Sequence, residues 1–148
     1  MTPSPSPRAN PYSILDEHAH LRRRLDDVRE ALIARRASGA VVASLFEELH
    51  RVVLDHFEHE EDGGYFAQAL FEAPRLSERA EQLLGQHVQM AAQLAALRSF
   101  ARQTRMSDPW WDELHELFDD FLRLFEQHES EENTLLYEAF NVDIGAED

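Results

Sequence analysis

Two short stretches of the chain each carry a histidine and a glutamate four residues apart. The first pair is His56 with Glu60, and the second is His128 with Glu132. On a helix, residues four apart lie on the same face, so each pair would place an imidazole next to a carboxylate. Imidazole nitrogen and carboxylate oxygen both bind transition metals. We therefore interpret the two pairs as parts of a metal site.

The composition restricts which atoms could hold that metal. The 148-residue chain contains eight histidines and no cysteine. This excludes disulfides, thiolate-bound zinc, iron–sulfur clusters and a cysteine nucleophile, and leaves histidine nitrogen and carboxylate oxygen as ligands. The formal net charge of −15 favours cation binding. It argues against a nucleic-acid partner, because the phosphates would be repelled.

The chain length suits one domain. Residues 1–12 are rich in proline and contain no apolar run, so they predict a disordered lead-in rather than a secretory signal. Residues 141–148 form a short acidic tail, which leaves residues 13–140 as the folded domain. No apolar stretch is long enough to cross a membrane, so we expect a cytoplasmic protein with no membrane partner.

Four segments repeat apolar residues every three or four positions, which is the period of a helix buried in a bundle. Ser38-Gly39 is expected to end the first helix, and Ser107 to cap the fourth. Gly63-Gly64 weakens the second helical pattern. The sequence therefore predicts an all-α, up-down-up-down antiparallel four-helix bundle. Its helices would cover residues 13–37, 40–71, 77–105 and 108–140.

The two halves of the chain also resemble one another. His18 aligns with His87 at an offset of 69 residues, and residues 56–60 align with residues 128–132 at an offset of 72. The neighbouring His20 and His59 have no histidine counterpart in the second half. We therefore predict an internal two-fold repeat of helical hairpins, each with one histidine and one His-x3-Glu pair.

Six polar residues occupy positions of these helices that should face the core: His18, His56, Glu60, His87, His128 and Glu132. Counted from the turns, the four histidines lie within about one helical turn, ~5 Å, of the same height. A single inward histidine is most often a core residue with a satisfied hydrogen bond. Two buried carboxylates without a cation, however, are very costly. The set predicts a metal centre, and its charge suits two bridged ions better than one.

The order of these elements resembles the hemerythrin-like, or HHE cation-binding, domain family. The resemblance rests on the first-helix histidine, His-Phe-x-x-Glu-Glu, the third-helix histidine and His-x3-Glu, and it extends from about Ser13 to Phe140. It implies a non-haem di-iron centre with an oxo or hydroxo bridge. Glu60 and Glu132 would bridge the two irons, and each iron would bind two histidines. Zinc or manganese could take the place of iron.

The sequence departs from the oxygen-carrying members of this family at two positions. Ala91 stands where they have a second third-helix histidine. Asn133 stands where they have an aspartate, and the preceding Glu132 is the better ligand. Each iron would then keep two of six octahedral positions for the bridge and an exogenous ligand. The resemblance therefore implies a more open centre, suited to O2, NO or peroxide rather than to reversible O2 transport.

Several other residues leave alternatives open. Glu47-x-x-His50 resembles the Glu-x-x-His motif of ferritin-like bundles, although the second half of the chain has no matching copy. Glu61 is the second candidate for the carboxylate ligand on the second helix. Arg22, one turn from His18, could hydrogen-bond a carboxylate behind the ligands.

Two further features concern the ends of the helices. Gly63 stands where the repeat has Leu135, and the missing side chain could leave a pocket beside the metals. Trp110-Trp111 is expected to close one end of the bundle, with an exposed partner surface as the alternative.

Three functions fit these residues. The first is a di-iron protein that binds or responds to O2, NO or iron. The second is a di-iron enzyme that acts on peroxide, NO or ferrous iron, and the third is an interaction module with a structural metal. The first is favoured, because the inward positions contain no obvious proton donor beyond the expected ligands.

Overall fold

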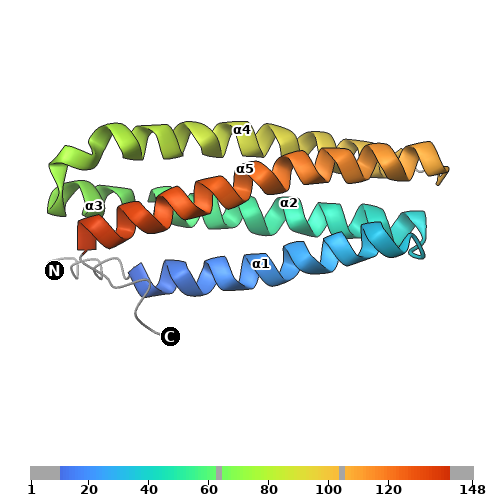
Figure 1. The fold of residues 1–148 in the computed structure, drawn as a ribbon, viewed down its shortest axis with the longest axis horizontal. Coiled ribbons are helices and arrows are strands. Elements are labelled where there is room, and N and C mark those ends of the chain that lie inside the picture. The colour runs from blue at the N-terminus through green and yellow to red at the C-terminus, as the bar shows by residue number, and fades with distance from the viewer. Residues whose placement is uncertain (1–10, 63–64, 104–105, 141–148) are drawn as a thin grey trace, which may run out of the picture.

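The computed structural model describes residues 11–62, 65–103 and 106–140, and every regular element in these ranges is a helix. Four long helices lie side by side along the longest axis of the molecule (Figure 1). They are α1 (Pro11–Ala34), α2 (Gly39–Asp62), α4 (Ser77–Arg102) and α5 (Asp108–Phe140). Among the described helices, none is long and apolar enough to span a membrane.

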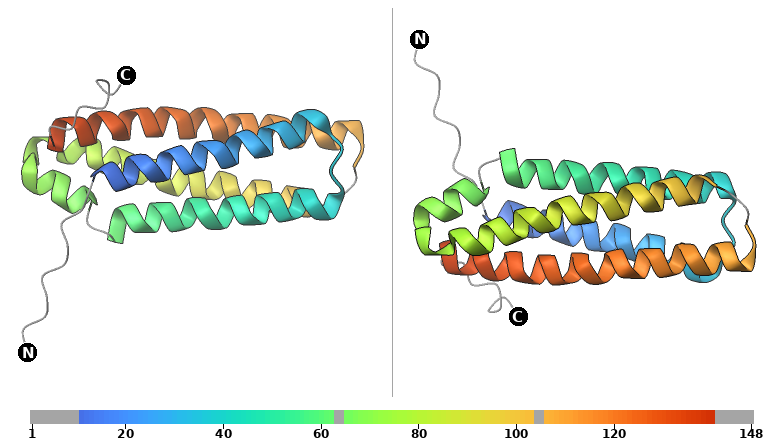
Figure 2. Two further views of the ribbon diagram at one scale, coloured as in Figure 1. Left: turned by 90° about the horizontal axis from the view of Figure 1, so that it is seen from below. Right: turned by 90° about the horizontal axis from the view of Figure 1, so that it is seen from above.

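The long helices pack around the axis in the cyclic order α1, α2, α4, α5 (Figure 2). The α1–α2 and α4–α5 connections lie at one end of the bundle. A short helix, α3 (Tyr65–Glu72), and a 3-10 turn, η1 (Pro74–Leu76), connect α2 to α4 at the other end (Figure 1). Each long helix therefore packs directly against two other long helices, and its inward face contributes to the core that all four helices share.

The first connection differs from the sequence prediction. Helix α1 ends at Ala34 rather than Ala37, because Arg35 adopts a left-handed conformation with a φ of 53°. Ser38 belongs to the next helix: its Oγ accepts a hydrogen bond from the Val41 amide at 3.2 Å. A serine in this position satisfies an amide that the helix itself cannot pair. Ser38 therefore caps α2 and does not end α1.

The prediction of one continuous helix over residues 40–71 is also wrong. Helix α2 ends at Asp62 and α3 begins at Tyr65 as a separate element (Figure 1). The Gly63-Gly64 pair between them, and with it the predicted pocket at Gly63, lies outside the described residues. Helix α4 begins at Ser77 as predicted and ends at Arg102, before the predicted Arg105.

The start of α5 agrees with the prediction. The Ser107 Oγ accepts a hydrogen bond from the Trp110 amide at 3.3 Å. Trp110 and Trp111 are both buried, and Trp110 stacks on Phe100 with 6.1 Å between the ring centroids. The tryptophan pair therefore closes the end of the core, and it is not an exposed surface for a partner.

The apolar core is divided into a large and a small part. The large part fills the bundle from the tryptophan end and includes Phe46, Phe118 and Phe125. The small part lies towards α3 and includes Leu83 and Leu135. Burying a side chain of this kind contributes about 1.5–3 kcal/mol, so both parts hold the helices firmly in register. The polar residues with metal-ligand chemistry fall between these two parts.

Candidate metal centre

The structure brings the six predicted residues together in one buried layer. Helix α1 contributes one histidine, α2 a histidine and a glutamate, α4 one histidine, and α5 a histidine and a glutamate. None exposes more than 4% of its surface. The residues, in chain order, are His18, His56, Glu60, His87, His128 and Glu132.

The side chains form two overlapping groups of four. Within each group, the atoms that could bind a metal all lie within 4.8 Å of one another. Both groups contain Glu60 and Glu132, and each adds two histidines of its own. The first group has the α1 and α2 histidines, and the second has the α4 and α5 histidines. Two adjacent metal positions that share both carboxylates would use every residue of the layer.

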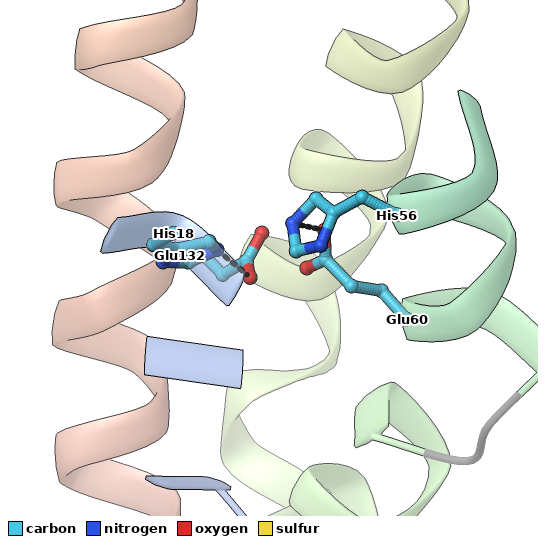
Figure 3. A group of neighbouring side chains, drawn as sticks. All are labelled: His18, His56, Glu60 and Glu132. Atoms are coloured by element: carbon cyan, nitrogen blue, oxygen red, sulfur yellow. Dashed lines mark ion pairs between the residues drawn. The ribbon is translucent and has the colours of Figure 1, made fainter. Parts of the chain in front are cut away.

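Figure 3 shows the first group, with the carboxylates of Glu60 and Glu132 pointing toward one another. The His18 Nε2 atom lies 3.1 Å from Glu132 Oε1. The His56 Nε2 atom lies 2.7 Å from Glu60 Oε1. Each histidine of this group therefore approaches a different carboxylate.

In the second group, too, each histidine lies beside a different carboxylate. The His128 Nε2 atom lies 2.9 Å from Glu132 Oε2, and the His87 Nε2 atom lies 3.8 Å from Glu60 Oε1. The two Nε2 atoms are 3.2 Å apart. Each carboxylate thus has a histidine nitrogen from both groups beside it, which is the arrangement that a bridging carboxylate requires.

The outer nitrogen of each histidine, Nδ1, donates a hydrogen bond to a side-chain oxygen on a neighbouring helix. Two of these oxygens are carboxylates: Glu17 Oε1 lies 3.3 Å from His56 Nδ1, and Glu61 Oε2 lies 3.3 Å from His87 Nδ1. An ionised carboxylate can only accept, so Nδ1 carries the hydrogen. In a neutral imidazole, this leaves the lone pair on Nε2, which faces the centre of the layer.

The other two acceptors are amides. The Asn133 Oδ1 atom lies 3.1 Å from His18 Nδ1, and the Gln86 Oε1 atom lies 2.8 Å from His128 Nδ1. The Gln86 amide nitrogen donates to Glu131 at 3.2 Å, which turns the amide oxygen toward the histidine. All four histidines therefore present Nε2 inward.

The inward direction of the four Nε2 atoms indicates whether the six residues of the layer suit a metal ion. Unprotonated Nε2 atoms and carboxylate oxygens are both acceptors, and they would repel one another at the observed distances. Glu60 Oε1 and both carboxylate oxygens of Glu132 are buried without a hydrogen-bond partner in the described part of the chain. Unpaired buried carboxylate oxygens are costly. A cation bound by both kinds of atom removes the repulsion, and this nitrogen and oxygen donor set suits iron.

Burial and the close approach of these groups also shift the pKa values of two residues in the layer. Burial and the adjacent Glu132 carboxylate raise the pKa of Glu60 well above its ordinary value. Burial and the neighbouring His128 imidazole lower the pKa of His87 to about 3. His87 is therefore neutral and ready to bind a metal at neutral pH, whereas Glu60 holds its proton up to a higher pH than an ordinary glutamate does.

Metal binding is therefore expected to release protons and to strengthen as the pH rises. Below the raised pKa of Glu60, each pH unit should weaken the apparent affinity by about tenfold, because one proton must leave. His87 should add nothing to this slope above its pKa of about 3. Isothermal titration calorimetry in two buffers of different ionisation enthalpy measures the protons released. An apparent affinity that does not strengthen as the pH rises toward the raised pKa of Glu60 would contradict the role of this carboxyl group.

The structure also shows which alternatives do not hold. Glu61 contacts the outer nitrogen of His87, and its side chain is 45% exposed, so it orients a histidine and does not replace Glu60. Glu47 pairs with Arg98 and Arg102 on α4 and is half exposed, so the ferritin-like reading is wrong.

The other histidines lie outside the layer. His20 is exposed and contacts Arg23. The His59 side chain is 46% exposed and pairs with Glu17. His115 is 29% exposed and lies near Asp119 on the same helix.

Sequence reasoning missed several residues around the layer. Glu17 and Gln86 were not singled out, although each immediately precedes a histidine of the repeat. Arg22 forms an ion pair with Glu129, the residue that follows His128. Glu129 is only 2% exposed, and its burial was not foreseen. Its spacing of four residues from the buried Phe125 was the available signal.

Comparison with known proteins adds a separate line of evidence. A family model described as the hemerythrin HHE cation binding domain matches residues 11–108 and again residues 78–148. Together the two matches cover the four long helices and all six residues of the layer. No curated protein and no solved structure matches the chain.

Proposed function

The chain belongs to the hemerythrin HHE cation-binding domain family, and from this premise we propose that its polar layer holds two iron ions. Glu60 and Glu132 would bridge the two ions. His18 and His56 bind one iron, and the histidines of α4 and α5 bind the other. The observation that carries this proposal is that the two groups of possible ligands share both carboxylates.

The distribution of the histidines over the helices supports the proposal. Each pair of consecutive long helices supplies both histidines of one group: His18 and His56 from α1 and α2, His87 and His128 from α4 and α5. This is what the predicted internal two-fold repeat in an up-down-up-down bundle would give. Two neutral imidazoles on each ion and two shared carboxylates also divide the negative charge equally between the ions.

The bound iron pair would supply redox chemistry with O2, NO or peroxide, and we propose that the protein binds or responds to such a small molecule. Support comes from the side of the layer near His87, where a surface pocket of about 320 Å³ reaches this histidine. The pocket is lined by apolar residues, among them Phe57 and Ala91, and by three acidic residues, Glu58, Glu61 and Asp62. The short side chain of Ala91 contributes to this space. The histidines and carboxylates hold the ions, and the apolar core on either side excludes water from them.

Metal analysis tests the first part of the proposal. Protein purified from iron-supplemented cells is expected to contain two iron ions per chain. The physical reason is that the six residues fall into two overlapping groups, each of which brings two histidine nitrogens and two carboxylates close enough together to hold an ion of its own. A yield of one zinc ion, or of no metal, would contradict the di-iron proposal.

Exposure of the reduced protein to O2 or NO under controlled conditions tests the second part. A reversible change in the visible spectrum after anaerobic reduction is expected for a binding or responding protein. Sustained consumption of peroxide over many turnovers would instead support the enzyme alternative. A loaded protein that shows neither behaviour would support a structural metal.

A further inference from the structure

The four acceptors behind the histidines form a closed ring around the bundle. Each of the four long helices supplies one histidine that donates and one acceptor that receives a hydrogen bond from the adjacent helix. The hydrogen bonds run from His18 on α1 to Asn133 on α5, from His128 on α5 to Gln86 on α4, from His87 on α4 to Glu61 on α2, and from His56 on α2 to Glu17 on α1.

The ring follows the same repeat as the histidines. Glu17 and Gln86 occupy equivalent positions, because each immediately precedes a histidine of the layer. Glu61 and Asn133 are also equivalent, because each immediately follows a carboxylate of the layer. At each equivalent pair, however, one residue is a carboxylate and the other is an amide. The ring therefore repeats in position but not in charge: both carboxylates belong to α1 and α2, and both amides belong to α4 and α5.

This difference in charge between equivalent acceptors has a consequence for the histidines. A carboxylate that accepts the Nδ1 hydrogen increases the electron density of the ring and makes Nε2 a stronger donor to a metal. A neutral amide does this less, because a hydrogen bond to a charged acceptor is stronger. His56 and His87 face carboxylates, whereas His18 and His128 face amides. Each group of possible ligands thus contains one histidine of each kind.

We propose that Glu17, Glu61, Gln86 and Asn133 are positioning residues that give each metal position one strong and one weak imidazole donor. The inference rests on the proposed function for the nature of the metal, but the ring itself acts on any divalent ion. The charged acceptors are divided equally between the two positions, so the ions have matched donor strength. Moving one carboxylate within the ring would make the two positions unequal.

Two of the four acceptors also contact a second side chain on the side away from the histidine. These contacts support their role as positioning residues. The second carboxylate oxygen of Glu17 lies 2.8 Å from His59 Nδ1. The amide nitrogen of Gln86 donates to Glu131. These outer contacts restrict the rotation of both acceptors, so that one oxygen stays on the histidine.

The proposal is tested by changing acceptor charge without removing the acceptor. In the iron-loaded full chain, Glu17→Gln should raise the midpoint potential, because a neutral partner stabilises the oxidised ions less. The double variant Gln86→Glu with Glu131→Gln should lower it, although the net charge is unchanged. The variant Glu58→Gln, at an exposed carboxylate of α2, is the matched control for Glu17→Gln, and the single variant Glu131→Gln is the reference from which the effect of Gln86→Glu is measured. Shifts in the same direction, or no larger than in the controls, would overturn the proposal.

A second measurement does not depend on iron. Asn133→Leu removes the acceptor for His18 and should weaken Co²⁺ binding by about 10–100-fold, whereas Asn133→Asp should retain tight binding. Both are measured by competition with a chelator while the visible spectrum of Co²⁺ is followed, and circular dichroism establishes that each variant is folded. Equal affinity of the folded Asn133→Leu variant and the wild type would overturn the proposal. If wild-type protein fails to bind two irons, only the proposed function fails, because the Co²⁺ measurement still tests the ring.

Discussion

Replacing Glu132 with alanine is expected to abolish metal binding at both positions of the layer. Glu132 belongs to both groups of possible ligands, and its two oxygens approach one histidine from each. On the proposed function, its removal would therefore take an oxygen ligand from both ions, together with one of the two bridges between them. Metal analysis of the purified variant should find little or no iron, compared with two ions per chain in the wild type.

The loss of metal from the Glu132→Ala variant should not result from unfolding of the protein. In the metal-free protein, burying Glu132 beside Glu60 costs free energy, whether the pair carries two charges or shares a proton, and removing Glu132 removes this cost. The melting temperature of the metal-free Glu132→Ala variant is therefore expected to equal or exceed that of the metal-free wild type. Glu126→Ala, which removes an exposed carboxylate from the same helix, is the matched control and should retain both ions. Retention of two ions by Glu132→Ala would show that this carboxylate is not a ligand.

Replacing His56 with alanine is expected to remove one ion and leave the other. His56 belongs only to the first group, and the second group keeps both of its histidines and both carboxylates. The metal content should therefore fall from two ions to one. Metal analysis combined with competition against a chelator measures the content and the affinity of the remaining ion.

Two nearby histidines provide controls for this variant. The His59 side chain is 46% exposed and contacts Glu17 rather than the layer, so His59→Ala should keep both ions. His20 is exposed, and His20→Ala should behave in the same way. Loss of both ions in His56→Ala would mean that the two positions cannot be filled independently. Unchanged metal content would show that His56 is not a ligand.

Much of the fold could be predicted from the sequence, because helical periodicity is a local property. The spacing of apolar residues predicted four long helices, and it placed His18, His56, His87 and His128 on inward faces. Where the prediction was wrong, a local signal was ambiguous. Ser38 can follow one helix or cap the next, and the hydrogen bond from Val41 shows that it caps α2.

The sequence by itself therefore determined which six residues face the core and that they would lie at one height. Two physical constraints suffice for this: a helix fixes the direction of each side chain, and short turns fix the relative height of successive helices. The cost of burying two carboxylates then argued for a cation. None of these arguments requires knowledge of how far each helix is rotated about its axis.

The tertiary structure alone decided what lies behind those six residues. Glu17, Gln86 and Asn133 reach a histidine on a different helix, and Glu61 orients His87 from the side of the layer. Such contacts depend on the rotation and separation of neighbouring helices, which local spacing does not encode. The inward direction of all four Nε2 atoms follows from these contacts. The sequence thus predicted the members of the layer, and the packing of the helices decided how each histidine is aimed.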